Sequence, residues 1–356
     1  MQKITLAGLT ALAVVALLAP VGPASAANDE PLTEKWAPSE WGPDDMAGAV
    51  NRTTPAMVLA AIKLVKQGKV ATLGKVYQSD MPMFGVRSFK LTIPGLPSSG
   101  PVPFGPRELV GNDEVLTAEI GQVGTQFDGP GHIGVRTSKG DFFYNGRMLA
   151  EVAGAYGVGP LGVEHVAQKG FVCRGVLLNA AAYRGMDRLP IPAPPPNKGD
   201  AGIITGEDIQ AMVKRQGIDP IGEGDCVFLY TGHGNIWHPR DWDTYDAAEK
   251  AKRVKEFNSG EPGFGTSGCT YLASRKIILT GADTWAVEAV APTFAGETEQ
   301  PFECHLEMIT KRGIWNIENL DLTQLVEDNV SEFLFVWSPL KIKGATGSPG
   351  NPVALY

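Results

Sequence analysis

The sequence predicts a single α/β domain, and three of its features support this. Short apolar segments typical of buried strands recur at 174–181 (RGVLLNAA), 227–232 (VFLYTG) and 276–282 (KIILTGA). Helix-start signals are mixed among such segments, without a regular alternation of strand and long helix. The 43 Gly and 27 Pro among 356 residues favour many turns and short elements.

Two helices and one further strand follow from local patterns. Thr53 or Thr54 can cap a helix that has Pro55 in its first turn and ends at Gly68. Thr205 and Asp208 form the pattern of a capping box, which predicts a helix through the following IQAMVKRQG. The segment 333–342 (FLFVWSPLKI) reads as a strand whose proline marks an edge or a bend. The Gly- and Pro-rich stretches at 92–106 and 190–197 are expected to be loops.

The first 26 residues have the pattern of a secretory signal peptide. A single Lys3 precedes an apolar run, and Ala24-Ser25-Ala26 forms a small-x-small cleavage site. A membrane anchor is the alternative, but the run from Ile4 to Leu18 is shorter than the roughly 20 residues that span a bilayer. We therefore expect a secreted or periplasmic protein that has no membrane contact after cleavage, with residues 27–356 forming one domain.

Charge and cysteine content restrict the function class. The net charge is -8 and no run of Lys or Arg occurs, so the pattern argues against a nucleic-acid partner. The four cysteines show no CxxC spacing, which excludes a zinc ribbon. Export would place them in an oxidising compartment, where three full pairings exist, and buried free thiols are an equally good interpretation. The four are Cys173, Cys226, Cys269 and Cys304.

The densest group of polar side chains lies between Gly121 and His132 (GQVGTQFDGPGH). In a strand, alternate side chains share a face, so Gln122, Gln126 and Asp128 would present oxygen atoms on one side. The Gly-Pro-Gly that follows could turn the chain and bring His132 back toward them. Oxygen ligands with an adjacent proton-transfer group are what a catalytic metal site requires. The alternative is a solvated strand face followed by a turn.

Other chemistries find little support. GxSxG, a phosphate-binding GxxxxGK[ST] and HExxH are all missing, and the GxGxxG at 157–162 lacks an acidic residue at the required distance. His233 directly follows a predicted strand and could line a pocket. Trp237 and Phe264 could form an aromatic wall for a flat substrate, or could be ordinary packing.

Beyond these local patterns, GTQFDGPGH resembles the signature of the metal-dependent cyclase family, H-x-G-T-H-x-D-x-x-x-H. That family includes bacterial kynurenine formamidase and isatin hydrolase. Further segments resemble it in the expected order along most of the chain: WGPDDMAGAVNRTTP at 41–55, LYTGHG at 229–234, EPGFGTSGCTYLASRKIILTGADTWAVEA at 261–289, HLEMITKRGIWNIENL at 305–320 and PLKIKGATGSPGNPVAL at 339–355.

The resemblance implies an α/β fold with a mixed, barrel-like β-core and flanking helices, in a homodimer. It implies hydrolysis of a C–N or ester bond in a small cyclic or aryl molecule by metal-activated water. Under it, Asp128 would be a metal ligand and His132 the acid/base residue. His305 and Glu318 would serve a second metal position or its remnant.

The chain departs from the signature at its first two histidines, which are Gln122 and Gln126 here. An amide oxygen is a harder and poorer ligand than imidazole, so the site would favour Mn²⁺ or another hard ion, while His305 still allows Zn²⁺. A second interpretation follows from the same change, in which the site is inactive and the secreted protein only binds a ligand. Thiol catalysis through Cys304, beside His305, is a third and weaker one, because adjacent side chains point in different directions.

Overall fold

The structure is a computed structural model that describes residues 32, 35–94, 103–194, 199–238, 240–292 and 302–356. The predicted signal peptide lies outside the described residues. None of the helices in these ranges is long and apolar enough to span a bilayer.

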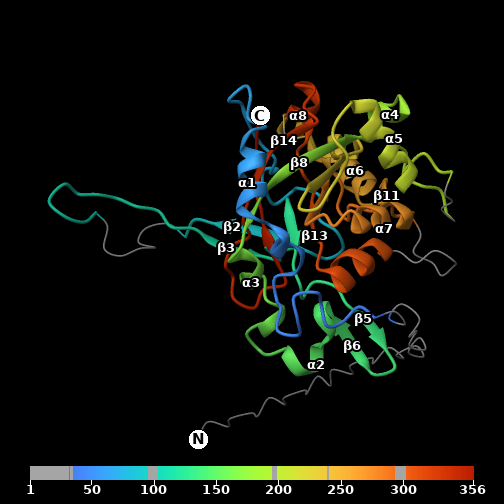
Figure 1. Ribbon diagram of the computed structural model, residues 1–356. Coiled ribbons are helices and arrows are strands. Elements are labelled where there is room, and N and C mark those ends of the chain that lie inside the picture. Colours follow the sequence, from blue (N-terminus) through green and yellow to red (C-terminus); the bar gives the residue numbers. More distant parts are fainter. Residues whose placement is uncertain (1–31, 33–34, 95–102, 195–198, 239, 293–301) are drawn as a thin grey trace, which may run out of the picture.

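A nine-stranded mixed sheet organises the molecule (Figure 1). Its order is β1-β16-β14-β8-β10-β12-β13-β4-β15. The strands β8, β10, β12 and β13 run parallel to one another, and antiparallel strands flank them on both sides. The sheet curls into a half-barrel with helices packed around it, which confirms the predicted α/β class with a mixed, barrel-like β-core. The strands of this sheet are β1 (Val70–Thr72), β4 (Gln126–Asp128), β8 (Phe171–Asn179), β10 (Cys226–Tyr230), β12 (Leu279–Ala282), β13 (Trp315–Glu318), β14 (Glu332–Trp337), β15 (Gly347–Pro349) and β16 (Val353–Leu355).

Three small sheets and short helices complete the fold. The small sheets are formed by β9 (Ile203–Ile204) with β11 (Gly263–Phe264), by β2 (Phe89–Thr92) with β3 (Val115–Ala118), and by β5 (Val135–Thr137), β6 (Gly140–Phe143) and β7 (Arg147–Met148). The described residues that precede β3, from 103 on, form an arm that extends away from the body (Figure 1). Leu109 and Val110 are exposed apolar residues of this segment. The α-helices are α1 (Pro55–Ile62), α2 (Leu149–Val152), α3 (Glu164–Ala167), α4 (Ala180–Arg184), α5 (Gly206–Gln216), α6 (Ala247–Phe257), α7 (Thr266–Ser274) and α8 (Thr323–Glu327). The other helices are 3₁₀-helices η2 (Gly48–Arg52), η3 (Tyr144–Gly146), η4 (Gly159–Leu161), η5 (His233–Trp237) and η6 (Trp242–Thr244), and one π-helix, η7 (His305–Thr310).

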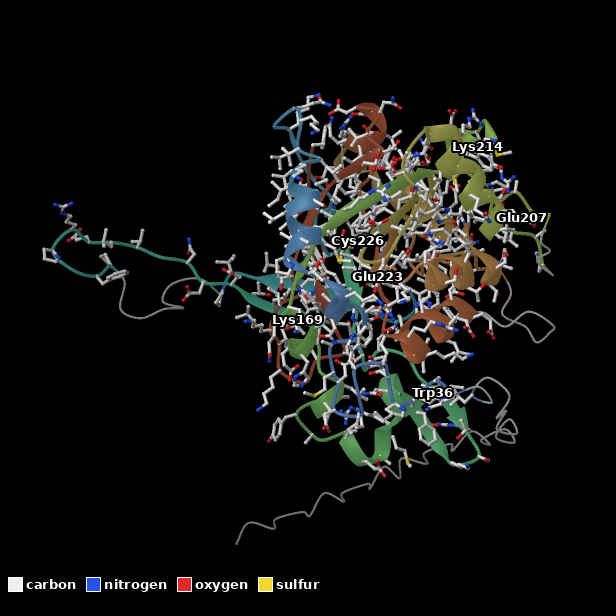
Figure 2. All side chains as sticks on the ribbon, in the orientation of Figure 1. Trp36, Lys169, Glu207, Lys214, Glu223 and Cys226 are labelled. Atoms are coloured by element: carbon white, nitrogen blue, oxygen red, sulfur yellow. A yellow bond between two sulfur atoms is a disulfide. The ribbon has the colours of Figure 1, made fainter. Side chains whose placement is uncertain are left out.

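Local signals place several helix starts correctly. The side chain of Thr54 caps α1 by accepting the N–H of Met57, and Pro55 stands in the first turn. Thr205 and Asp208 form the predicted capping box of α5. Figure 2 shows Glu207 and Lys214 of this helix at the edge of the molecule, whereas Cys226 lies in its interior.

Three predicted elements are longer than those observed. The first helix ends at Ile62 instead of Gly68. The last predicted strand stops at Trp337, two residues before Pro339, which has no N–H to donate to a neighbouring strand. The strand expected over Gln122–Asp128 begins only at Gln126, because Gly124 takes a left-handed conformation with φ of 66°.

The main core packs against the sheet. Phe127, between two polar residues of β4, is fully buried beside Phe171, Trp315 and Trp337. Its burial fixes which face of β4 the flanking side chains occupy, because neighbouring residues of a strand point to opposite faces. The opposite face of this short strand is where the candidate site lies.

Candidate active site

Two antiparallel strands place three polar side chains on one face of the sheet. In the register of β13 with β4, Glu318 stands opposite Gln126 and Asn316 opposite Asp128. Residues directly opposite one another in an antiparallel pair share a face. Gln126, Asp128 and Glu318 are therefore neighbours, although 190 positions of sequence separate Asp128 from Glu318, and all three are buried.

A glycine-rich turn returns His132 to this face. The N–H of His132 donates to the carbonyl of Gly129 at 3.0 Å, and a Cβ at Gly131 would come within 2.8 Å of Val158. The turn therefore needs a glycine at position 131. The ring atom Nε2 of His132 lies 3.6 Å from Oδ1 of Asp128, and the side chain keeps 20% of its surface exposed. The predicted return of His132 is confirmed.

The π-helix η7 supplies the second histidine. His305 is the first residue of this helix and is buried. Its Nε2 lies 3.4 Å from Oδ2 of Asp128 and 3.6 Å from Oε1 of Glu318. Each of Asp128, His132 and His305 offers a ligand atom such that all three atoms lie within 4.8 Å of one another, close enough to hold one metal ion.

The charges of this cluster are strongly coupled. Burial opposes the ionised form of Asp128, but the nearby rings of His132 and His305 hold the pKa of its carboxyl well below the usual range. Burial likewise opposes charge on His305, yet the surrounding carboxyl groups of Asp128, Glu288 and Glu318 raise the pKa of its imidazole well above the usual value. The ring of His305 therefore carries a positive charge among the carboxylates when no other cation is present.

Glu318 and His132 are shifted in a way that suits proton transfer. Burial and the negative charge of Asp128 raise the pKa of Glu318 to about 8. Burial also lowers the pKa of His132, against the opposing effect of Asp128. His132 is consequently neutral near pH 7 and able to accept a proton, as a general base must be.

The two glutamines do not present their oxygens to this cluster as predicted. Nε2 of Gln122 donates to Oδ1 of Asp128 at 3.1 Å, and Nε2 of Gln126 donates to Oε2 of Glu318 at 2.6 Å. A carboxylate can only accept hydrogen bonds, so an amide beside it turns its N–H₂ group toward it. The glutamines therefore act here as hydrogen-bond donors to the acidic side chains, and their role as oxygen ligands of a metal stays a prediction.

Three residues predicted to contact substrate are buried among packing partners, and their contact with substrate stays a prediction. Nε2 of His233 lies 3.1 Å from the carbonyl of Phe257, and the ring is 1% exposed. Trp237 is buried against Trp242 and Phe257, and Phe264 is buried in the main core. Their apolar surroundings explain this placement, because large aromatic groups gain most from complete burial.

The four cysteines form two disulfides, Cys173–Cys226 and Cys269–Cys304. Buried free thiols, the alternative interpretation, are not what the structure contains. A sulfur held in a disulfide is no nucleophile, so the thiol-based mechanism through Cys304 has no reactive group.

Sequence reasoning missed two buried acidic residues beside the cluster. Glu288 lies 2.5 Å from Nδ1 of His305, and Glu261 accepts hydrogen bonds from the backbone N–H groups of Trp285 and Ala286. An available signal was the apolar context of Glu288 (WAVEAV), since a lone acidic residue in an apolar run is expected to have a buried partner.

The cluster has the properties of a divalent-cation site. Oδ2 of Asp128 is buried and has no hydrogen-bond partner among the described residues. Buried carboxylate oxygens without partners are costly unless a cation neutralises them. Nε2 of His305 lies 3.4 Å from Asp128 and 3.6 Å from Glu318, and imidazole with carboxylate is a donor set that Zn²⁺ and Mn²⁺ both accept. Asp128 and His305, with His132 and Glu318 beside them, therefore fit a metal ion.

Comparisons with known proteins identify the family of this chain. Residues 45–289 match the family model described as a putative cyclase. A crystal structure of a novel cyclase is 27% identical, with a TM-score of 0.71, and the match covers 89% of this chain and 96% of that one. No curated protein matches the sequence.

Two isatin hydrolases share the fold at lower identity. Isatin hydrolase A from Labrenzia aggregata, bound to benzyl benzoate, is 19% identical with a TM-score of 0.52 over 80% of this chain and 93% of its own. Isatin hydrolase A from Ralstonia solanacearum is 19% identical with a TM-score of 0.53 over 85% of this chain and 98% of its own. The matched family model spans more than half of the sequence, and the chain belongs to the cyclase family.

Proposed function

We propose that this protein is a metal-dependent hydrolase that cleaves a C–N or ester bond in a small cyclic amide, aryl formamide or lactone. The observation that carries the proposal is the convergence of Asp128, His305 and Glu318 next to His132. Membership of the cyclase family supports it, and so does the fold shared with the two isatin hydrolases.

Asp128, His305 and Glu318 would hold the metal ion, for which Mn²⁺ and Zn²⁺ are the best candidates. When bound, such an ion polarises a carbonyl group and lowers the pKa of water toward about 7. The N–H groups of Gln122 and Gln126 orient the carboxylates of Asp128 and Glu318, since each donates to one carboxylate oxygen and leaves the other toward His305.

His132 would carry the proton in the reaction. Its Nε2 accepts a proton from water as the water oxygen forms a bond to the substrate carbonyl carbon. The same nitrogen then gives the proton to the leaving nitrogen or oxygen as the old bond breaks. Its partial exposure gives substrate access to the ring, and its contact with Asp128 stabilises the charged ring that forms in between.

The remaining expectations concern where the protein works and in what form. We propose that residues 1–26 direct it to the periplasm or the medium, and that a homodimer is its assembled state. Neither bears on the chemistry, because every residue assigned a role above comes from one chain.

The test is hydrolysis by protein purified without chelator, assayed on lactones, cyclic imides and aryl formamides. We expect activity on at least one class, its loss with EDTA, and its return with Mn²⁺ or Zn²⁺. Asp128→Asn should lose activity and metal. The control variant Asp141→Asn, whose carboxylate forms an ion pair with the exposed Arg136, should keep both. A protein that binds these compounds without turnover under any ion would instead be the secreted ligand-binding protein.

A further inference from the structure

One buried carboxylate, that of Glu288, controls how the π-helix η7 begins. Its Oε2 accepts the backbone N–H of Cys304 at 3.0 Å, and its Oε1 accepts the backbone N–H of His305 at 3.1 Å. The same Oε1 lies 2.5 Å from Nδ1 of His305. Glu288 is 4% exposed, so these contacts are shielded from water.

The contact at Nδ1 determines which nitrogen of His305 is free. A carboxylate accepts and cannot donate, so Nδ1 of His305 must carry the hydrogen. The other nitrogen, Nε2, then faces Oδ2 of Asp128 and Oε1 of Glu318 at 3.4 and 3.6 Å. A carboxylate that holds one ring nitrogen of a histidine in this way fixes the ring and makes the other nitrogen a better metal ligand.

The backbone that carries Glu288 is itself strained. Val287 has a φ of 66°, which is a rare conformation for a β-branched residue. Such strain persists only where surrounding contacts impose it, and it concentrates at functional sites. Val287 is buried, and its carbonyl accepts the N–H of Phe264 at 3.1 Å.

Glu261 imposes that conformation from the N-terminal side. Its two carboxylate oxygens accept the N–H groups of Trp285 and Ala286 at 2.6 and 2.7 Å. Its own backbone N–H donates to the carbonyl of Val290 at 2.8 Å, and the N–H of Val290 donates back at 2.9 Å. Bonds on both sides of Val287 therefore leave the segment little freedom to relax.

A covalent tie fixes the other partner. The disulfide Cys269–Cys304 joins α7 to the residue directly before His305. Both the acceptor, Glu288, and the helix start that donates to it are thus held in place.

We infer that Glu288 is a positioning residue that aims Nε2 of His305 at the metal position, and that Glu261 braces it. The inference rests on the proposed metal-dependent function. It predicts that loss of Glu288 weakens metal binding with Asp128, His305 and Glu318 all present. The effect should be about 10- to 100-fold in the dissociation constant, as for comparable partners of metal-bound histidines.

Titration of the metal-free protein with Zn²⁺ and Mn²⁺ in a calorimeter tests this. The variants are Glu288→Ala, Glu288→Gln, Glu261→Gln and the control Glu307→Gln, an acidic residue of the same helix that pairs with Lys311 and Arg312. We expect the weakest binding for Glu288→Ala. Glu288→Gln should recover part of the affinity, because its amide oxygen can still accept the Nδ1 hydrogen. Glu261→Gln should lie nearer the wild type, and Glu307→Gln should equal it.

Crystal structures of metal-free wild type and Glu288→Ala add a readout that needs no metal. We expect Nε2 of His305 to move away from Asp128 and Glu318 in the variant, because the acceptor for Nδ1 is lost. Unchanged metal affinity in Glu288→Ala, or an unmoved ring in that variant, would overturn the inference. If the ring moves in Glu288→Ala but the wild type binds neither ion, the result would count against the metal-dependent function alone.

Discussion

Gln126 and Glu318 stand opposite one another on antiparallel strands, and Nε2 of Gln126 donates to Oε2 of Glu318 at 2.6 Å. The signature that this chain resembles has a histidine where Gln126 stands. From this position the amide holds a carboxylate. We therefore expect a single metal ion, on the side of His305.

Restoring the signature should add metal-binding capacity. In the double variant Gln122→His/Gln126→His, two imidazoles would join Asp128, and imidazole is a much better Zn²⁺ ligand than an amide. We expect more Zn²⁺ per chain than in wild type, measured by elemental analysis after dialysis. Gln168→His, at an exposed position, is the matched control. An unchanged Zn²⁺ content in the double variant would show that the glutamine positions do not face an ion.

Removing His132 should lower the rate of hydrolysis without changing the metal content. His132→Ala is expected to lower kcat by about 10²- to 10⁴-fold, because general acid–base help of that size is lost. Since Asp128, His305 and Glu318 are retained, the metal content should change little. His165→Ala, which removes a histidine bonded to the carbonyl of Gly159, should leave kcat unchanged. Full turnover by His132→Ala would refute the assignment.

A buried neutral histidine should make stability fall in mild acid. Burial lowers the pKa of His233 from 6.5 to about 3, against the bond to Phe257. Between these values the unfolded chain binds more protons than the folded one, so acid favours unfolding. From pH 6.5 to 5 this one group should remove about 2 kcal/mol of unfolding free energy.

Urea unfolding of wild type and His233→Gln across that range measures the effect. Other groups titrate equally in both proteins, so the difference between the two slopes isolates His233. Parallel slopes would mean that folding does not lower the pKa of the His233 ring.

The two disulfides should have different consequences for the site. Cys173–Cys226 joins the neighbouring strands β8 and β10 in the core, so Cys173→Ala/Cys226→Ala should lower the unfolding free energy by about 2–4 kcal/mol. Cys269→Ala/Cys304→Ala should cost a similar amount and also weaken metal binding, because Cys304 precedes His305. Thermal unfolding and metal titration of both variants distinguish the two. Equal metal affinity in the two variants would contradict a role of the second disulfide at the site.

Local physics made part of the fold predictable. The caps at Thr54 and Thr205 and the buried strands at β8, β10 and β12 depend on neighbouring residues, which the sequence displays directly. Strand β4 begins only at Gln126 because Gly124 is left-handed. Gly124 packs against Tyr77, a residue distant in the sequence. Such contacts decide element boundaries and are invisible in a local pattern.

Two local rules, the alternation of side chains in a strand and the turn at Gly129–Gly131, made part of the site predictable. Those two rules place Asp128 beside His132, whereas the arrival of His305 and Glu318 was implied only by the resemblance. The amide orientation of Gln122 and Gln126 depends on carboxylates that approach from another strand or turn. The apolar context of Glu288 indicates a buried partner, but its contact with His305 also depends on the left-handed backbone at Val287, which the residue types do not predict.

Elemental analysis of wild type and His305→Ala, both purified without chelator, tests the central claim most directly. If Asp128, His305 and Glu318 hold a catalytic ion, wild type should contain Mn²⁺ or Zn²⁺ and His305→Ala should contain far less at equal folded content. Wild type free of divalent metal even after incubation with both ions, or a His305→Ala variant that holds as much, would contradict the account.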